Sequence, residues 1–221
     1  RRDHVVSAPF GAERVDPYYW LRDDARLQPE VLAYLKAENA YADAVMAPLR
    51  PLEDRLYDEI VGRIKQDDSS VPYRRRGYWY YSRFEAGKNY PVYARRRGEM
   101  TAAEEVLLDI DAMAGDKDYF QVGALAVTVD GRRLAWAEDL NGRRQYTLRF
   151  RDLDGGATLA DEIPSTSGSM VWADDGRSLY YIENDPQTLL GRWVKRHVIG
   201  TPVADDVLVY EEADESFYIG L

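Results

Sequence analysis

The sequence predicts a mainly β protein in which an N-terminal helical arm precedes part of a β-propeller. Three observations lead to this prediction. A strand–turn–strand pattern recurs 45 positions apart, at Asp130 and Asp175. The chain contains 17 Tyr and 5 Trp, which favour strands, and its first 65 residues place apolar side chains at helical spacing. With 45% hydrophobic and 31% charged residues among 221, the chain is long enough for a buried core.

The N-terminal arm is expected to cover residues 1–70. It begins with a Pro-led aromatic cluster at 16–21, which is typical of a turn that inserts rings into another surface. Apolar residues then recur at helical spacing through 30–46, Pro48 and Pro51 end that helix, and a second helix follows. The arm offers these helices few apolar partners, so we expect them to pack on another domain.

Residues 71–221 are expected to form about two to three propeller blades. The first blade should begin with a hairpin whose strands lie at 73–83 and 89–97. A turn centred on Ala86-Gly87 predicts two cross-strand pairs, Tyr80 with Tyr93 and Tyr78 with Arg95.

Two arginine runs, Arg74-Arg75-Arg76 and Arg95-Arg96-Arg97, should meet at the open end of this hairpin. Basic side chains interleaved with aromatic ones are the only feature here that is typical of nucleic-acid binding. The net charge of -10 opposes a polyanion, and no recognition module accompanies the runs. We therefore expect no nucleic-acid partner. The arginines are expected to cover apolar sheet surface and to pair with acidic residues.

The clearest repeat has one copy at 127–138 and another at 171–183, each built around the core Asp-Gly-Arg-x-Leu. Each core indicates strand, tight turn and strand, and two further strand signals follow it. A strand-rich unit with a period of about 40–50 residues is typical of a propeller blade. Propellers close with about four to eight blades, so the predicted strands leave open sheet edges. We therefore expect the chain to be part of a larger protein.

Catalytic motifs are absent from the sequence. It has no G-x-S-x-G, H-E-x-x-H, Walker A or G-x-G-x-x-G pattern and no cysteine. The two histidines are His4, in the arm, and His197, in a strand with alternating polarity. Neither has the partners of a catalytic triad in its motif, so we interpret both as structural or surface residues.

The acidic clusters are interpreted as solvated loop residues. One of them resembles an oxygen-rich metal loop and comprises Asp109, Asp111, Asp116 and Asp118. Its spacing does not fit an EF-hand, because Met113 and Phe120 stand where ligands are needed. Asp205-Asp206 and Glu211-Glu212 are interpreted in the same way. We expect no metal and no cofactor. We also expect no membrane partner, because no stretch approaches the roughly 20 apolar residues of a membrane span.

Several motifs in order resemble the prolyl oligopeptidase family of serine peptidases, and within it the oligopeptidase B branch. The longest is Asp16-Pro17-Tyr18-Tyr19-Trp20-Leu21-Arg22-Asp23-Asp24. The other matching segments are YLKAEN at 34–39, EIVGRI at 59–64, YF at 119–120, RQYTLRF at 144–150, RHVIGT at 196–201 and YEEAD at 210–214. The resemblance covers nearly the whole chain, which makes it far more specific than any single motif.

The resemblance implies a seven-bladed propeller that caps a C-terminal α/β-hydrolase domain, which is not in this chain. It implies a serine-type endopeptidase that cleaves short peptides after Arg or Lys, with its catalytic triad in the hydrolase domain. No residue of this chain then takes a catalytic role. Its implied roles are a gate against large substrates and a docking surface for the hydrolase domain. The alternative is a non-catalytic β-propeller interaction module, which would have no need for the apolar helices of the arm.

The resemblance also implies salt bridges between propeller and hydrolase domain that help to form the active state. Glu138 and Asp139 end a strand of the first clear repeat and are the candidate carboxylates for such an interdomain contact. The alternative is that they are ordinary strand-end acids. The residues do not encode a compartment. The family is mostly cytoplasmic, and a periplasmic location applies to members with a signal peptide.

Overall fold

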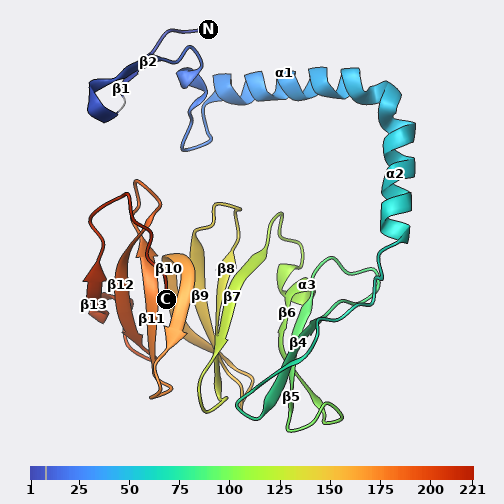
Figure 1. Ribbon diagram of the computed structural model, residues 1–221, viewed down its shortest axis with the longest axis vertical. Coiled ribbons are helices and arrows are strands. Elements are labelled where there is room, and N and C mark those ends of the chain that lie inside the picture. The colour runs from blue at the N-terminus through green and yellow to red at the C-terminus, as the bar shows by residue number, and fades with distance from the viewer. Residues whose placement is uncertain (8) are drawn as a thin grey trace. The chain divides into compact units, whose positions relative to one another are not determined.

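The computed structural model describes residues 1–7 and 9–221, which fall into two units, Arg1–Lys65 and Gln66–Leu221. The first unit contains the two long helices, and the second contains two larger sheets (Figure 1). The predicted fold class, a mainly β chain with an N-terminal helical arm and part of a propeller, is confirmed.

The first unit follows the predicted order of turn, helix, break and helix. Pro29 starts the first helix because its missing N–H is not needed in a first turn. Pro48 lies in the short 3-10 segment that separates the two helices, as the sequence predicts. The elements of this unit are β1 (Val5–Ser7), η1 (Pro9–Gly11), β2 (Glu13–Val15), η2 (Tyr19–Leu21), α1 (Pro29–Met46), η3 (Ala47–Leu49) and α2 (Arg50–Gly62).

Apolar side chains on both helices remain exposed. In α1, Val31 is buried, but Leu35 exposes 49% of its surface. In α2, Leu56 and Ile60 expose 47% and 59%. Exposed aliphatic side chains at helical spacing give each helix an apolar face that is suited to packing. The expectation that this face packs on another domain stays a prediction.

The second unit begins with a four-stranded antiparallel sheet, which we call blade 1. A short helix, α3 (Ile110–Ala114), follows it, and the side chain of Asp109 caps this helix by accepting from the N–H of Ala112 at 3.0 Å. The strands of blade 1 are β3 (Tyr73–Arg75), β4 (Tyr78–Arg83), β5 (Val92–Arg97) and β6 (Glu104–Asp109).

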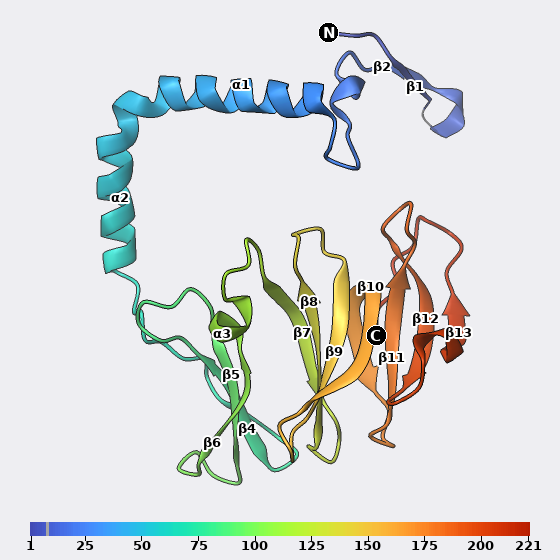
Figure 2. The same cartoon turned by 180° about the vertical axis from the view of Figure 1, so that it is seen from behind.

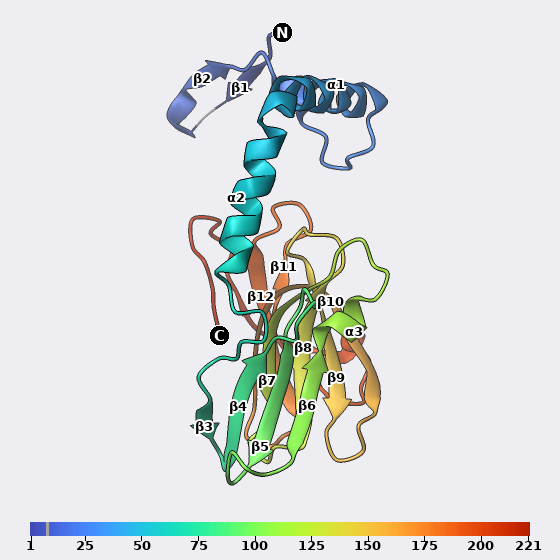
Figure 3. The same cartoon turned by 90° about the vertical axis from the view of Figure 1, so that its right-hand side faces the viewer.

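The predicted repeat forms two further blades that share one strand. β10 (Thr158–Trp172) pairs with β9 through its first half and with β11 through its second half. The sheet order β13-β12-β11-β10-β9-β8-β7 therefore contains blade 2, β7 to β10, and blade 3, β10 to β13 (Figure 2). Figure 3 shows β4, β5 and β6 of blade 1 next to one another. The other elements are β7 (Gln121–Val127), β8 (Arg133–Asp139), β9 (Tyr146–Asp152), β11 (Ser178–Asn184), β12 (Gly191–Val198), η4 (Val203–Asp205) and β13 (Val207–Glu211).

The predicted register of the first hairpin is wrong by two residues. Tyr80 pairs with Arg95 and not with Tyr93, and Tyr78 pairs with Arg97. The tight turn lies at Ala86-Gly87 as expected, where the N–H of Lys88 donates to the carbonyl of Glu85. The ladder, however, ends at the pair Arg83 and Val92, so more residues of the connection follow this turn than precede it, and the strand pairing is centred one residue later. A shift of two residues keeps every side chain on its predicted face.

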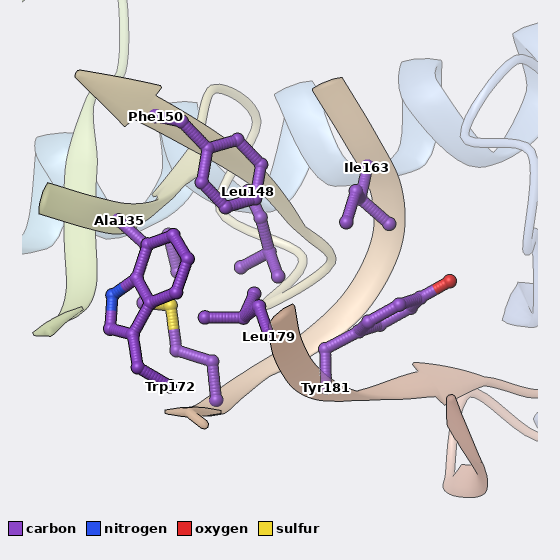
Figure 4. Close-up of a cluster of buried hydrophobic side chains, with 9 residues drawn as sticks. Ala135, Leu148, Phe150, Ile163, Trp172, Leu179 and Tyr181 are labelled. Carbon is purple, nitrogen blue, oxygen red and sulfur yellow. The ribbon is translucent and has the colours of Figure 1, made fainter. Parts of the chain in front are cut away.

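The core consists of two apolar clusters. One contains Tyr80, Leu108 and Trp136 among others and joins blades 1 and 2. The other lies within blades 2 and 3, where the side chains of Leu148, Phe150 and Leu179 converge (Figure 4). Full burial of such a side chain contributes about 1.5–3 kcal/mol.

The Asp-Gly turn of each repeat also binds the preceding blade. The guanidinium of Arg95, in blade 1, donates to the carbonyl of Gly131 at 2.7 Å. Arg133, in blade 2, donates in the same way to the carbonyl of Gly176 at 2.5 Å. Both glycines have positive φ, 76° and 64°, which a two-residue turn of this kind requires. The recurring motif therefore closes a hairpin and links neighbouring blades.

Acid is expected to weaken the turn of the second repeat. Asp175 accepts hydrogen bonds from the N–H of Ser178 and of Arg177, both at 2.8 Å, and these lower the pKa of Asp175 to about 2. Because the unfolded chain keeps the ordinary value of about 3.9, the stabilisation is complete above that pH and is lost as pH falls toward 2. Asp175→Asn should therefore remove part of the decrease in Tm between pH 4 and pH 2.

The matched control is Asp174→Asn, because Asp174 is exposed and adjacent. Thermal unfolding of both variants and the parent between pH 2 and pH 6 makes the comparison. Equal decreases in Tm for the parent and Asp175→Asn would contradict this prediction.

Candidate functional site

The first strands of the three blades line a hollow of about 430 Å³. These strands are β3, β7 and the second half of β10, and in a propeller the first strand of each blade borders the central channel. We call this feature the first-strand hollow. Its lining residues are Tyr73, Arg75, Arg76, Tyr80, Leu125, Ala126, Val127, Thr128, Met170, Val171, Trp172 and Asp174.

The first-strand hollow combines aromatic rings with two arginines. The rings of Tyr73 and Tyr80 stack with centroids 5.6 Å apart. Among residues 1–7 and 9–221, no carboxylate forms an ion pair with Arg75 or Arg76. The hydroxyl of Thr128 donates to the carboxylate of Asp130 at 2.6 Å within its own turn. The hollow is therefore suited to binding an anionic group and carries no nucleophile with an adjacent base.

Both predicted interdomain carboxylates have partners inside blade 2. Glu138 accepts from the guanidinium of Arg149 at 2.9 Å and from the indole N–H of Trp136 at 3.1 Å. Asp139 is fully buried and accepts from three backbone N–H groups, those of Asn141, Gly142 and Arg144, at 2.8–3.0 Å. Glu138 retains an exposed fraction of 11% in its side chain. A role for either residue between domains stays a prediction.

The two histidines have different environments. His4 stacks on Tyr19 with ring centroids 3.9 Å apart, in the exposed arm. His197 is fully buried, as fits the structural role that we expect for it. Its Nδ1 lies 2.7 Å from a carboxylate oxygen of Asp206, and its Nε2 lies 3.0 Å from one of Asp161. We call these three residues the Asp–His–Asp cluster.

The interpretation of Asp206 as a solvated acid is wrong. Its side chain is 2% exposed, and besides His197 it accepts from the hydroxyl of Tyr181 at 2.8 Å. The reason is the 3-10 turn η4, which directs the chain back over β12 before β13 begins. This contact and burial raise the pKa of the Tyr181 hydroxyl, with burial the larger cause. Asp205, by contrast, is exposed.

The remaining acidic residues bond within the chain or face solvent. In the cluster that resembles a metal loop, Asp109 caps α3 and Asp111 forms an ion pair with Lys88 at 2.6 Å, while Asp116 and Asp118 are exposed. Glu211 pairs with Arg192, and Glu212 accepts from the hydroxyl of Tyr210. Over the described ranges, no group of three His, Asp or Glu residues is placed to hold a metal ion.

Three of the six arginines in the two runs lie over aromatic rings, as the sequence predicts for their stems. Arg95 is 4% exposed at its side chain, lies 4.0 Å from the ring centroid of Tyr78 and pairs with Glu105 at 2.8 Å. Arg96 lies over the ring of Tyr81, and Arg74 lies over that of Trp79. The stems of Arg74, Arg95 and Arg96 thus cover aromatic surface, whereas Arg75 and Arg76 line the first-strand hollow and Arg97 is exposed. In the part of the chain that the structure describes, no helix is long and apolar enough to span a membrane.

Three successive blades, linked by Asp-Gly turns and preceded by an arm with two helices, define a β-propeller segment with an N-terminal helical extension. The whole chain, residues 1–221, matches the family described as "Prolyl oligopeptidase, N-terminal beta-propeller domain". The chain therefore belongs to the prolyl oligopeptidase family, in agreement with the resemblance seen in the sequence.

Curated relatives are peptidases of about three times this length. Dipeptidyl aminopeptidase BI of Pseudoxanthomonas mexicana is 57% identical over an alignment 237 residues long, which covers 100% of this chain and 33% of the relative. Protease 2 of Moraxella lacunata is 36% identical, over 94% of this chain and 31% of the relative. The chain thus spans about a third of the length of the curated relatives it matches.

The solved structures give the same assignment. Oligopeptidase B from Leishmania major superposes with a TM-score of 0.89 at 33% identity, over 96% of this chain and 32% of that one. Oligopeptidase B from Trypanosoma brucei, with covalently bound antipain in a closed form, gives a TM-score of 0.87 at 31% identity over the same shares.

Sequence reasoning missed both the Asp–His–Asp cluster and the first-strand hollow. Asp161 lies 36 positions from His197, and Asp206 lies 9 positions away across a turn, so no local spacing marks the cluster. The hollow is assembled from strands of three blades, and only blade packing brings them together. Only the arginines of the hollow left a signal in the sequence. The run Arg74-Arg75-Arg76 is followed directly by Gly77, which could have indicated a tight turn with basic side chains.

Proposed function

We propose that this chain is the N-terminal and propeller portion of a serine-type oligopeptidase that cleaves short peptides after Arg or Lys. The observation that carries the proposal is the likeness to oligopeptidase B from Leishmania major, at 33% identity over 96% of the chain. The sequence motifs are spread over both units, so the likeness does not depend on the propeller alone.

In this proposal the chain supports catalysis and does not perform it. Residues 1–70 carry the arm whose helices dock on the protein's own C-terminal α/β-hydrolase domain, which supplies the triad. Their exposed Leu35, Leu56 and Ile60 provide the apolar face for that contact. Residues 71–221 form part of the gate, because a narrow channel between rigid blades admits short peptides and excludes folded proteins. Peptide substrate and hydrolase domain are the proposed partners.

A second candidate reaction is the removal of dipeptides from a free amino end, as the name of the relative at 57% identity describes. The two reactions differ in what they require before the scissile bond. An endopeptidase accepts an amino-blocked Arg-Arg reporter, whereas a dipeptidyl aminopeptidase needs the unblocked one.

The test uses the full-length protein and four fluorogenic substrates, amino-blocked and unblocked Arg-Arg and amino-blocked and unblocked Ala-Ala. The proposal expects cleavage of both Arg-Arg substrates, faster than of either Ala-Ala one. Cleavage of the unblocked forms only would favour dipeptide removal. No cleavage of any of them would favour the non-catalytic interaction module.

Glu138→Gln in the full-length protein is expected to lower kcat/KM by about fivefold, which corresponds to about 1 kcal/mol of interdomain coupling. The amide keeps an acceptor for Trp136 and Arg149 but loses the charge, so Tm should change little. The control is Glu162→Gln, because Glu162 pairs with the same Arg149 at 2.5 Å and is 49% exposed. An unchanged kcat/KM for Glu138→Gln would remove the interdomain role.

A further inference from the structure

The first-strand hollow contains two arginines that form no ion pair with any of the described residues. Some arginines of the blades have acidic partners, such as Arg83 with Glu104 and Arg192 with Glu211, both at 2.9 Å, whereas others, such as Arg97, form no ion pair with the described residues and face solvent. In a chain with a net charge of -10, acidic residues are plentiful. Nevertheless, within the described residues, Arg75 and Arg76 both line the hollow without an ion pair to any of them.

The backbone at Arg76 supports a role for its side chain. Arg76 has φ of 49° and Gly77 has φ of 82°, so they form the two central positions of a tight hairpin turn. Asn or Gly adopts the first of these positions with the least strain, and Arg is disfavoured there. A residue kept in a strained conformation, with its side chain at a hollow, is typical of a binding position.

The other walls of the hollow are suited to a peptide and not to a polyanion. Tyr73 and Tyr80 offer stacked ring surface, and Trp172, which donates its indole N–H to the carbonyl of Ala126 at 3.0 Å, forms a rigid apolar wall. Asp174 also lines the hollow and repels any extended chain of negative charges. A volume of about 430 Å³ lies within the range of small-ligand sites.

We propose that the first-strand hollow binds the free C-terminal carboxylate of a peptide, with Arg75 and Arg76 as its charge partners and the tyrosine rings against its last side chain. Guanidinium groups match a planar carboxylate in charge and geometry, and two of them bind it more strongly than one. This inference rests on the proposed peptidase function for its ligand class. It adds that the propeller selects peptides by their carboxyl end.

The test measures kcat/KM of the full-length protein for three forms of one peptide. The first has a free C-terminal carboxylate, the second has a C-terminal carboxamide, and the third is the carboxamide with an internal Gln replaced by Glu. The parent protein should cleave the first form with kcat/KM about fivefold above the second and the third. Arg75→Gln/Arg76→Gln should reduce that ratio to about one, because the free carboxylate loses its charge partners. Arg74→Gln is the matched control, because Arg74 lies on the same strand outside the hollow.

Binding gives a readout that does not depend on cleavage. Labelled D-peptides with either C-terminus resist hydrolysis, and the fluorescence anisotropy of their complexes with the full-length protein reports binding. It should show a preference for the carboxylate form, which 0.5 M salt and the double variant should both remove.

The outcomes separate this site from the proposed function. A preference for the carboxylate in binding, without cleavage of any substrate, would contradict the proposed function and support this site. Cleavage with a ratio of one in the parent, or equal gains from the internal Glu, would overturn this site and leave the proposed function. A loss of Tm in the double variant well beyond that of Arg74→Gln would also overturn it, because the arginines would then pair within the protein.

Discussion

Replacing His197 by Ala is expected to lower the free energy of unfolding by about 3–5 kcal/mol, which is the range for removing one partner from a buried charged group. His197 joins β12 to Asp161 on β10 and to Asp206 after η4, at 3.0 and 2.7 Å. The two Asp side chains are 8% and 2% exposed, so they have little water to replace the lost ring. Its ring also packs against Phe150, with centroids 5.9 Å apart.

The matched control is His4→Ala, because His4 is the other histidine of the chain and is exposed. Its expected effect lies within about 0.5 kcal/mol. Asp206→Asn should fall between the two, since the amide keeps the shape and loses the charge. Urea unfolding followed by tryptophan fluorescence measures all three variants. A loss below about 1 kcal/mol for His197→Ala would show that the cluster is not a structural joint.

The blade repeat was predictable because it has a local cause. Gly131 and Gly176 stand where each tight turn needs positive φ, and strand-forming residues flank both. The two helices were predictable for a similar reason, because apolar spacing and the break at Pro48 are read along the chain. Patterns of this kind depend on a few neighbouring residues and survive any change in tertiary packing.

The hairpin register was not predictable in the same way. The ladder ends at the pair Arg83 and Val92, which leaves a long connection that periodicity does not centre. The N–H of Phe84 donates to the carbonyl of Asp68 at 2.8 Å, so a segment before the sheet helps to set where the hairpin turns. A register that depends on a third segment cannot be deduced from the two strands alone.

The candidate site was predictable only in its composition. The arginine runs were visible in the sequence, and pairing with acidic residues was the expected outcome. Arg95 follows that expectation, whereas Arg75 and Arg76 do not. What separates them is their place in the sheet of blade 1. Arg95 lies on β5 directly opposite Glu105 of β6, whereas Arg75 ends the edge strand β3 and Arg76 lies in the turn that follows it.

Replacing Arg95 by Met is expected to lower the free energy of unfolding by about 2–3 kcal/mol and to loosen blade 1 from blade 2. The guanidinium donates to Gly131 and to Glu105, at 2.7 and 2.8 Å, and lies over the ring of Tyr78 at 4.0 Å. Met retains most of the volume, so the loss comes from a buried carbonyl without a donor and from the cation–π contact. Arg95→Lys should recover only part, because one ammonium cannot reach both acceptors in the geometry of a planar fork.

The position of the loss distinguishes a joint between blades from a general loss of stability. Amide hydrogen exchange in Arg95→Met should rise in β4, β5 and β8, which border the contact, and should stay unchanged in β11 and β12 of blade 3. Arg97→Met is the control, because Arg97 is exposed on the same strand. Exchange that rises equally in all three blades would contradict a local joint. It would imply that the blades unfold as one unit, and the Arg133 contact to Gly176 would then be the next link to remove.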